Sequence, residues 1–143
     1  DPHAMKERLK KAIADRFRGR ACMVQPFRQR VVEEGEYSLF FFAGEYSHAI
    51  LKVPAPDEFR SQEERGADIQ PIRAEGQLLE RGQQALAAVE PAPLYARVDL
   101  VRNAADDFEV MELELIEPSL YLRTDPGAPG RFADALDRWF ARA

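Results

Sequence analysis

The chain has 143 residues and an apolar content of 45%, enough for one domain with a buried core. Its net charge of −5, with no run of Lys or Arg, argues against a nucleic-acid-binding surface. No apolar run approaches the ~20 residues of a membrane span and no signal-peptide core is found, so we expect no membrane partner. The single cysteine, Cys22, excludes an internal disulfide and fits a reducing, cytoplasmic location.

The amino terminus divides into a short tag and a domain. We interpret Asp1–Ala4 as a remnant of a cloning vector and predict one domain from residue 5 to residue 143. Because His3 lies in the tag, His48 is the one histidine available for chemistry. A Ser-His-Asp triad or a histidine-rich metal site is therefore disfavoured, and we expect His48 to be structural.

The first predicted elements are a helix and a strand. Met5–Arg18 has apolar residues at the spacing of one helix face. Ala21–Phe27 is an apolar run that we expect to form a short buried strand, ended by Pro26 because proline cannot continue a central ladder. Cys22 lies in this run, so we expect a buried structural thiol and not a nucleophile.

A hairpin follows after a polar connection. Glu36–Phe42 and Glu45–Val53 are predicted strands joined by Ala43–Gly44, a two-residue turn in which glycine supplies a positive φ. Phe40–Phe42 place phenylalanine on both faces of the first strand. We therefore expect this strand to be covered on both sides.

The remaining segments complete the element order. Pro54–Ala67 has no periodicity and is expected to be a long loop. We predict a short extended piece over Asp68–Ile72 and helices over Glu75–Val89 and Gly130–Ala143. The last helix carries aromatic residues that we expect to anchor it in the core. These residues are Trp139 and Phe140.

Short turns between strands argue for an antiparallel sheet with helices packed on one face, which is an α+β architecture. Neither GxxxxGK[ST] nor GxGxxG is present, so the two common phosphate-loop fingerprints are absent from the sequence.

Two further predicted strands, Leu94–Val101 and Glu109–Ile116, are joined by a polar turn and carry most of the charged residues of interest. Alternation along each strand places four of these residues on one face of the hairpin. They are Arg97, Asp99, Glu112 and Glu114.

A symmetric hairpin sets Asp99 opposite Glu112 and Arg97 opposite Glu114. Like charges directly opposite one another destabilise a sheet by up to ~1 kcal/mol, so a cation is expected between the carboxylates. Hard divalent ions such as Mg²⁺ prefer carboxylate oxygens together with substrate phosphates. The alternative, a solvated charged face without a ligand, stays open.

The segment from residue 21 to residue 118 resembles the ATP-grasp carboxylate–amine ligases, a family that includes glutathione synthetase and D-alanine–D-alanine ligase. These enzymes carry an Asp on one strand and Glu-x-Asn or Glu-x-Glu on the next, followed by Pro. Asp99, Glu112, Glu114 and Pro118 match that pattern. The resemblance implies that the three acids hold Mg²⁺ at the ATP phosphates and that Arg97 neutralises phosphate charge. Glu114, where many relatives carry Asn, adds a negative charge.

Upstream motifs match in the same order. Val24-Gln25-Pro26-Phe27 resembles the hinge strand that pairs with adenine, and Glu36 matches the acid that accepts the ribose hydroxyls. Lys52 matches a basic position near the phosphates, and the loop around Arg60 resembles one that brings an Arg to the acyl phosphate. The runs GEYSLFFF, HAILK and MELELIEPSLYL are most similar to a bacterial subgroup with a ring-forming ligase of cycloserine biosynthesis.

The resemblance implies a reaction between two small molecules, a carboxylate and an amine. ATP phosphorylates the carboxylate, and the amine attacks the acyl phosphate to give an amide, ADP and phosphate. Family members are considerably longer, so we expect this chain to be the C-terminal half of a larger enzyme. Without the N-terminal half, we expect the chain to be inactive. Homo-oligomerisation stays open, as do two alternatives: a nucleotide- or metal-binding module without turnover, and a structural domain.

Overall fold

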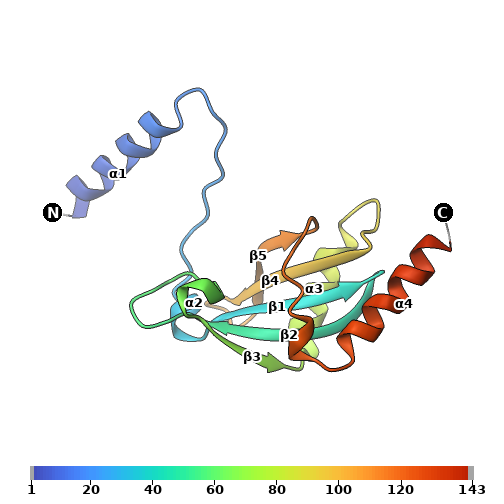
Figure 1. Ribbon diagram of the computed structural model, residues 1–143. Coiled ribbons are helices and arrows are strands. Elements are labelled where there is room, and N and C mark those ends of the chain that lie inside the picture. Colours follow the sequence, from blue (N-terminus) through green and yellow to red (C-terminus); the bar gives the residue numbers. More distant parts are fainter. Residues whose placement is uncertain (1, 142–143) are drawn as a thin grey trace.

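The computed structural model describes residues 2–141 and shows one antiparallel sheet with helices around it (Figure 1). The helices are α1 (Pro2–Arg16), α2 (Arg30–Glu33), α3 (Gly76–Ala87) and α4 (Ala128–Phe140), with 3₁₀ turns at Glu63–Arg65 and Leu122–Thr124. The strands are β1 (Glu36–Phe42), β2 (Glu45–Val53), β3 (Asp68–Ile72), β4 (Tyr95–Arg102) and β5 (Phe108–Glu114). They lie in the order β3-β2-β1-β4-β5.

The predicted β1–β2 hairpin is confirmed with the predicted bounds. Ala43 and Gly44 both have positive φ, 49° and 87°, as the tight turn that matches strand twist requires. β1 is the middle strand of the sheet, with β2 on one side and β4 on the other. Phe40, Phe41 and Phe42 are all buried, which confirms that β1 is covered on both faces.

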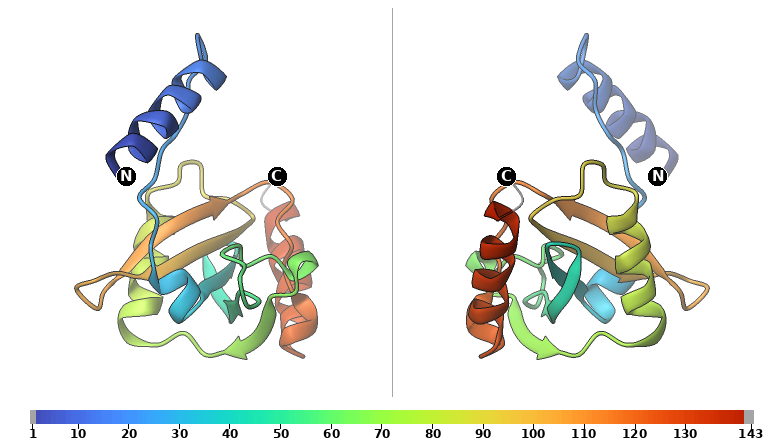
Figure 2. Two further views of the ribbon diagram at one scale, coloured as in Figure 1. Left: turned by 90° about the vertical axis from the view of Figure 1, so that its left-hand side faces the viewer. Right: turned by 90° about the vertical axis from the view of Figure 1, so that its right-hand side faces the viewer.

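Helices cover both faces of the sheet, and Figure 2 shows α3 and α4 on opposite sides of it. The core on one face joins Leu39 and Phe41 to Leu78 of α3. On the other face Phe132 of α4 packs against Phe42, with ring centroids 5.0 Å apart. The α+β class with an antiparallel sheet is confirmed, but the helices do not share one face. The physical reason is that β1 presents aromatic side chains on both sides, and each side needs an apolar cover.

The segment Ala21–Phe27 forms no strand, and this prediction is wrong. Met23 is 85% and Val24 74% exposed, and Cys22 is exposed as well, so its predicted burial is also wrong. The sheet consists of β1–β5, and this apolar run lies outside it. Preceding it, α1 stands apart from the sheet (Figure 1), and its Leu9 is exposed.

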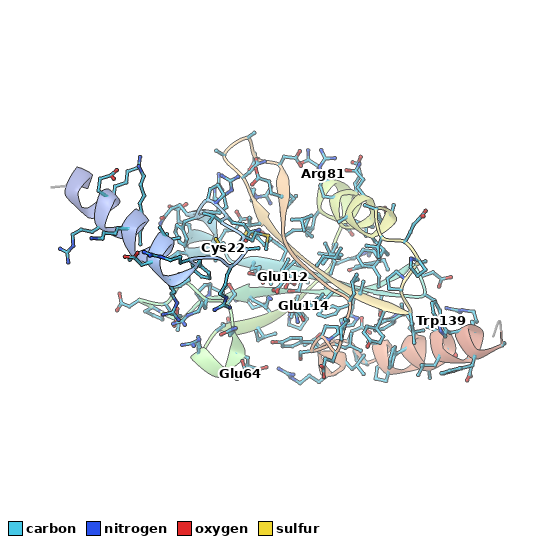
Figure 3. All side chains as sticks on the ribbon, turned by 90° about the horizontal axis from the view of Figure 1, so that it is seen from above. Cys22, Glu64, Arg81, Glu112, Glu114 and Trp139 are labelled. Atoms are coloured by element: carbon cyan, nitrogen blue, oxygen red, sulfur yellow. The ribbon has the colours of Figure 1, made fainter. Side chains whose placement is uncertain are left out.

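The other predicted elements are present, with one further correction. β3, α3 and α4 are found close to the predicted bounds, and the loop before β3 contains only a 3₁₀ turn. Trp139 and Phe140 do not anchor the core, because both are exposed. Phe140 is the last residue of α4, and Figure 3 shows Trp139 near that outer end of the helix. Ala135 and Phe132, one and two turns earlier, make the inward contacts of this helix. In residues 2–141 no helix is long and apolar enough to cross a membrane.

Candidate functional site

The candidate site lies on the face of the sheet opposite α3. Along that face of β1, Glu36 and Ser38 are polar, whereas Phe40 and Phe42 are aromatic. Alternation places these four side chains on one side of the strand. α4 covers the aromatic end through Phe132, which leaves the polar end to form the site.

The predicted register of the charged hairpin is confirmed. Asp99 of β4 lies opposite Glu112 of β5, and Arg97 lies opposite Glu114. One oxygen from each of the three carboxylates lies within 4.8 Å of the others. Figure 3 shows Glu112 and Glu114 close together over the sheet. The structure therefore brings together all of the residues that the sequence predicts as metal ligands.

Asp99 is the buried centre of the site, with 1% of its surface exposed. Ser38 Oγ donates to Asp99 Oδ1 at 2.6 Å, and Arg97 donates through Nε to Oδ1 at 3.0 Å and through Nη2 to Oδ2 at 2.9 Å. Lys52 Nζ lies 3.5 Å from Oδ2. A buried carboxylate is costly unless it is paired and hydrogen-bonded, and these partners meet that need.

Lys52 links Asp99 to Glu36. Its ammonium forms an ion pair with Glu36, the residue directly opposite on β1, and both side chains are largely buried. Burial raises the pKa of the Glu36 carboxyl, and the Lys52 charge only partly offsets this effect. The ion pair with Glu36 therefore holds the positively charged Lys52 ammonium in place beside the carboxylates.

Glu112 and Glu114 form the outer part of the cluster, toward solvent. Burial, followed by repulsion from Glu114 and Asp99, raises the pKa of the Glu112 carboxyl. The repulsion from Glu114 and Asp99 exceeds the opposing effect of Arg97, so the cluster carries negative charge in excess. An all-oxygen donor set with excess negative charge fits a hard divalent cation such as Mg²⁺.

A cavity of about 380 Å³ adjoins the carboxylates. Its walls include eight of the ten residues that the sequence assigns to the site. These are Gln25, Phe27, Glu36, Lys52, Arg60, Arg97, Glu112 and Glu114. Asp99 lies beneath this surface, bonded to Arg97. Val24 does not line the cavity and is exposed, so the structure does not bring it into the site.

Two loop segments form the mouth of the cavity. Phe27 and Phe59 meet edge to face with centroids 6.2 Å apart. Arg60 lies at the rim, where its guanidinium pairs with Glu58 through Nε and Nη2, both at 3.0 Å. The structure therefore places Arg60 near the site while its charge is engaged with a neighbour in the loop.

His48 has the structural role expected of it. Its ring stacks on Phe40 with centroids 4.3 Å apart, and Nε2 lies 3.0 Å from the Leu120 carbonyl oxygen. Burial lowers the pKa of His48, which favours the neutral ring. Nothing in this geometry points to proton transfer at the carboxylates.

Sequence reasoning missed Ser38 and Met111. Ser38 is fully buried and bonded to Asp99, and the Met111 carbonyl accepts a hydrogen bond from Gln25 at 3.3 Å. The signal for Ser38 is a small polar residue in an otherwise apolar strand. Its partner depends on the pairing of β1 with β4, which no local pattern predicts.

Fold and site together define an antiparallel α+β domain with a carboxylate cluster beside a ligand-sized cavity. No protein-family model matches the chain. Over 135 residues it is 36% identical to the cycloserine biosynthesis protein DcsG of Streptomyces lavendulae, covering 82% of this chain and 42% of that protein. The crystal structure of D-cycloserine synthetase DcsG matches with a TM-score of 0.66 and 37% identity, over 78% of this chain and 40% of that one.

Two further solved structures show weaker likeness. D-alanine–D-alanine ligase from Bacillus anthracis complexed with ATP is 24% identical with a TM-score of 0.49, over 71% of this chain and 35% of that one. The ATP-grasp ligase PsnB, complexed with a precursor variant, Mg and ADP, is 13% identical with a TM-score of 0.49, over 94% of this chain and 51% of that one. The DcsG match confirms the predicted family: the chain belongs to the ATP-grasp ligases and corresponds to the C-terminal half of the ATP-grasp region. It spans 42% of the length of the DcsG protein.

Proposed function

We propose that this chain supplies the metal- and phosphate-binding part of an ATP- and Mg²⁺-dependent carboxylate–amine ligase. The observation that carries the proposal is the convergence of Asp99, Glu112 and Glu114 within 4.8 Å, beside a cavity lined by Lys52 and Arg97. The chain's likeness to a synthetase supports this class of chemistry.

Each part of the site has a role in this proposal. Asp99, Glu112 and Glu114 would hold Mg²⁺, which neutralises phosphate charge when bound. The cavity walls around Gln25, Phe27 and Glu36 would accept the base and ribose of ATP. Val24 keeps its proposed role only through its backbone, because its side chain is exposed.

The proposed reaction has two steps. The γ-phosphoryl group of ATP moves to an oxygen of a substrate carboxylate, which gives an acyl phosphate and ADP. An amine then attacks the acyl carbon and loses a proton, and phosphate leaves as the amide forms. Both steps gather negative charge, so they depend on cations placed in advance. Lys52, Arg97 and Arg60 would provide them, and no side-chain nucleophile is needed.

A second candidate is a nucleotide- and metal-binding module without turnover in this chain. The specific observation in its favour is that the chain spans 42% of the DcsG protein. The carboxylate and amine would then bind partly to residues of a missing N-terminal half, which we propose as a partner. A cytoplasmic location would suit the consumption of ATP.

Calorimetric titration of MgADP and MgATP tests the proposal, with EDTA as the metal-free control. Binding is expected to require Mg²⁺ and to weaken about tenfold, or about 1.4 kcal/mol, in Glu112→Gln. Glu109→Gln is the matched control, because Glu109 lies on the same strand but pairs with Arg28 outside the cluster. Equal affinity of the parent and Glu112→Gln would show that the metal assignment is wrong.

Turnover needs a separate measurement. ADP release and amide formation are compared for this chain alone and for this chain fused to the part of DcsG that it does not match. Activity only in the fusion supports a ligase half-domain. Nucleotide binding without activity in either form supports the binding module.

A further inference from the structure

The guanidinium of Arg97 lies among the carboxylates of the cluster. Its Nη2 faces one oxygen of each: Asp99 Oδ2 at 2.9 Å, Glu114 Oε1 in a close ion pair, and Glu112 Oε2 at 3.9 Å. Arg97 is itself buried, and it also lines the cavity. One nitrogen of the protein therefore faces the same three side chains that are proposed to hold the metal.

Asp99 has no free direction in which to bind a second cation. Its Oδ1 accepts from Ser38 and from Arg97 Nε, and its Oδ2 accepts from Arg97 and faces Lys52. Mg²⁺ approaches its oxygen ligands to about 2.1 Å and demands near-octahedral geometry. At least one of these donors must move aside before Asp99 can bind the ion.

Arg97 is the donor that can move. Ser38 is fixed in the middle strand, and Lys52 lies 3.5 Å from Oδ2, whereas Arg97 donates to both oxygens of Asp99, at 2.9 and 3.0 Å, and blocks both of them. The long Arg97 side chain borders a cavity of about 380 Å³, so its head group has space on the side away from Asp99. That cavity is where the proposed function places phosphate, an anion that arginine binds well.

We propose that Arg97 is a displaceable counter-ion that couples metal binding to anion binding in this site. It competes with the divalent cation for Asp99 and Glu114, and on displacement it turns into the cavity toward an anionic ligand. Each ligand then favours the other by the same factor, because coupling between two sites is reciprocal. This inference rests on the proposed function and adds the coupling between its two ligands.

The first test measures metal binding without nucleotide. Mn²⁺ binding is followed by electron paramagnetic resonance for the parent, Arg97→Gln, Arg97→Lys and a control, Arg81→Gln. Arg81 pairs with Asp107 at 2.8 Å, and Figure 3 shows it on α3, well apart from Glu112 and Glu114. The control removes one positive charge, as Arg97→Gln does, but leaves the cluster intact.

Arg97→Gln is expected to bind Mn²⁺ roughly tenfold more tightly than the parent, because a positive charge about 4 Å away is removed. Arg97→Lys should remain within about threefold of the parent, since a competing charge is kept, and Arg81→Gln should match the parent. Unchanged or weaker binding in Arg97→Gln would overturn the inference while leaving the proposed function in place. Absence of Mn²⁺ binding in every protein, with ADP present as well as without it, would instead overturn the proposed function.

The second test covers a variant that folds poorly. Thermal unfolding is followed by circular dichroism in EDTA and in Mg²⁺. Without Arg97 the carboxylates repel one another, so Arg97→Gln should unfold at a lower temperature in EDTA and gain more from Mg²⁺ than the parent does. A variant that stays unfolded in Mg²⁺, or gains no more than the parent, contradicts the inference.

Coupling is tested by repeating the Mn²⁺ titrations with inorganic phosphate. Association of Mn²⁺ with phosphate in solution affects all proteins equally, so the comparison with Arg81→Gln removes it. Phosphate should tighten Mn²⁺ binding in the parent and in Arg81→Gln but not in Arg97→Gln. An equal effect in all three proteins would show that Arg97 does not couple the two ligands.

Discussion

Removal of the Ser38 hydroxyl tests the buried centre of the site. Ser38 is fully buried, and its Oγ donates to Asp99 at 2.6 Å. Ser38→Ala deletes one oxygen and leaves almost no cavity, so the expected effect is the loss of a hydrogen bond to a charged acceptor. Such bonds contribute about 1.5–3 kcal/mol. We expect a loss of about 2 kcal/mol in the free energy of unfolding.

The chain offers a matched control at Ser61. Its side chain is also buried, and among the described side chains of residues 6–141 its Oγ is the one buried side-chain oxygen or nitrogen that has no hydrogen-bond partner. Ser61→Ala removes a polar atom that was left unsatisfied on folding. The free energy of unfolding should therefore stay unchanged or rise by up to about 1 kcal/mol.

Urea denaturation followed by circular dichroism in EDTA measures both changes. Far-ultraviolet signal is preferable to fluorescence, because the single tryptophan, Trp139, is exposed on α4 and does not report on the sheet. For a chain of this length the Ser38→Ala loss corresponds to about 8 °C in the unfolding temperature. Equal stabilities of Ser38→Ala and Ser61→Ala would refute the reasoning that a bonded hydroxyl holds Asp99 in place.

Two further predictions concern the sheet around the site. Burial lowers the pKa of His48 in the folded protein, so the unfolded chain binds a proton more readily. The contribution of the neutral ring to stability is therefore complete above pH 6.5 and is lost as the pH falls through the lowered pKa. Urea titrations at about pH 7.5 and about pH 5.5 should therefore show a larger loss of stability in the parent than in His48→Gln. Gly35 has φ +113°, and an added Cβ would lie 2.8 Å from the Lys52 carbonyl oxygen. Gly35→Ala should lower the free energy of unfolding by about 2–4 kcal/mol. Gly44 lies in an open turn, and asparagine tolerates positive φ, so Gly44→Asn should lower it by less than about 1 kcal/mol in the same assay.

The local patterns of the sequence predicted the two hairpins and the cluster of charges. Alternation within a hairpin was enough to predict Asp99 opposite Glu112, because both strands lie close in sequence, although the β4–β5 register shifts between Asp99 and Leu100, nearer the turn. The same holds for the turn at Ala43–Gly44. Such patterns predict which residues are neighbours within a hairpin, and the three carboxylates of the cluster all lie in the β4–β5 hairpin.

Contacts between distant segments could not be predicted in this way. Ser38 and Asp99 are 61 positions apart, and their contact depends on which strand lies beside β1. The apolar run Ala21–Phe27 has the composition of a buried strand, but composition does not say whether a neighbouring strand is present. Trp139 has helical spacing with Phe132, yet it is exposed because the outer end of α4 carries it away from the packed turns.

The two outer strands of the sheet are protected from pairing with other molecules in different ways. β3 carries Pro71, which cannot donate to a further ladder, whereas β5 carries Glu109, Glu112 and Glu114. Glu109 pairs with Arg28 and Glu114 with Arg97, so the more exposed Glu112 contributes most of the repulsion that opposes pairing of the β5 edges of two molecules. A divalent ion at the cluster would cancel much of that repulsion, so this protein should aggregate more readily in concentrated solution as divalent metal is added.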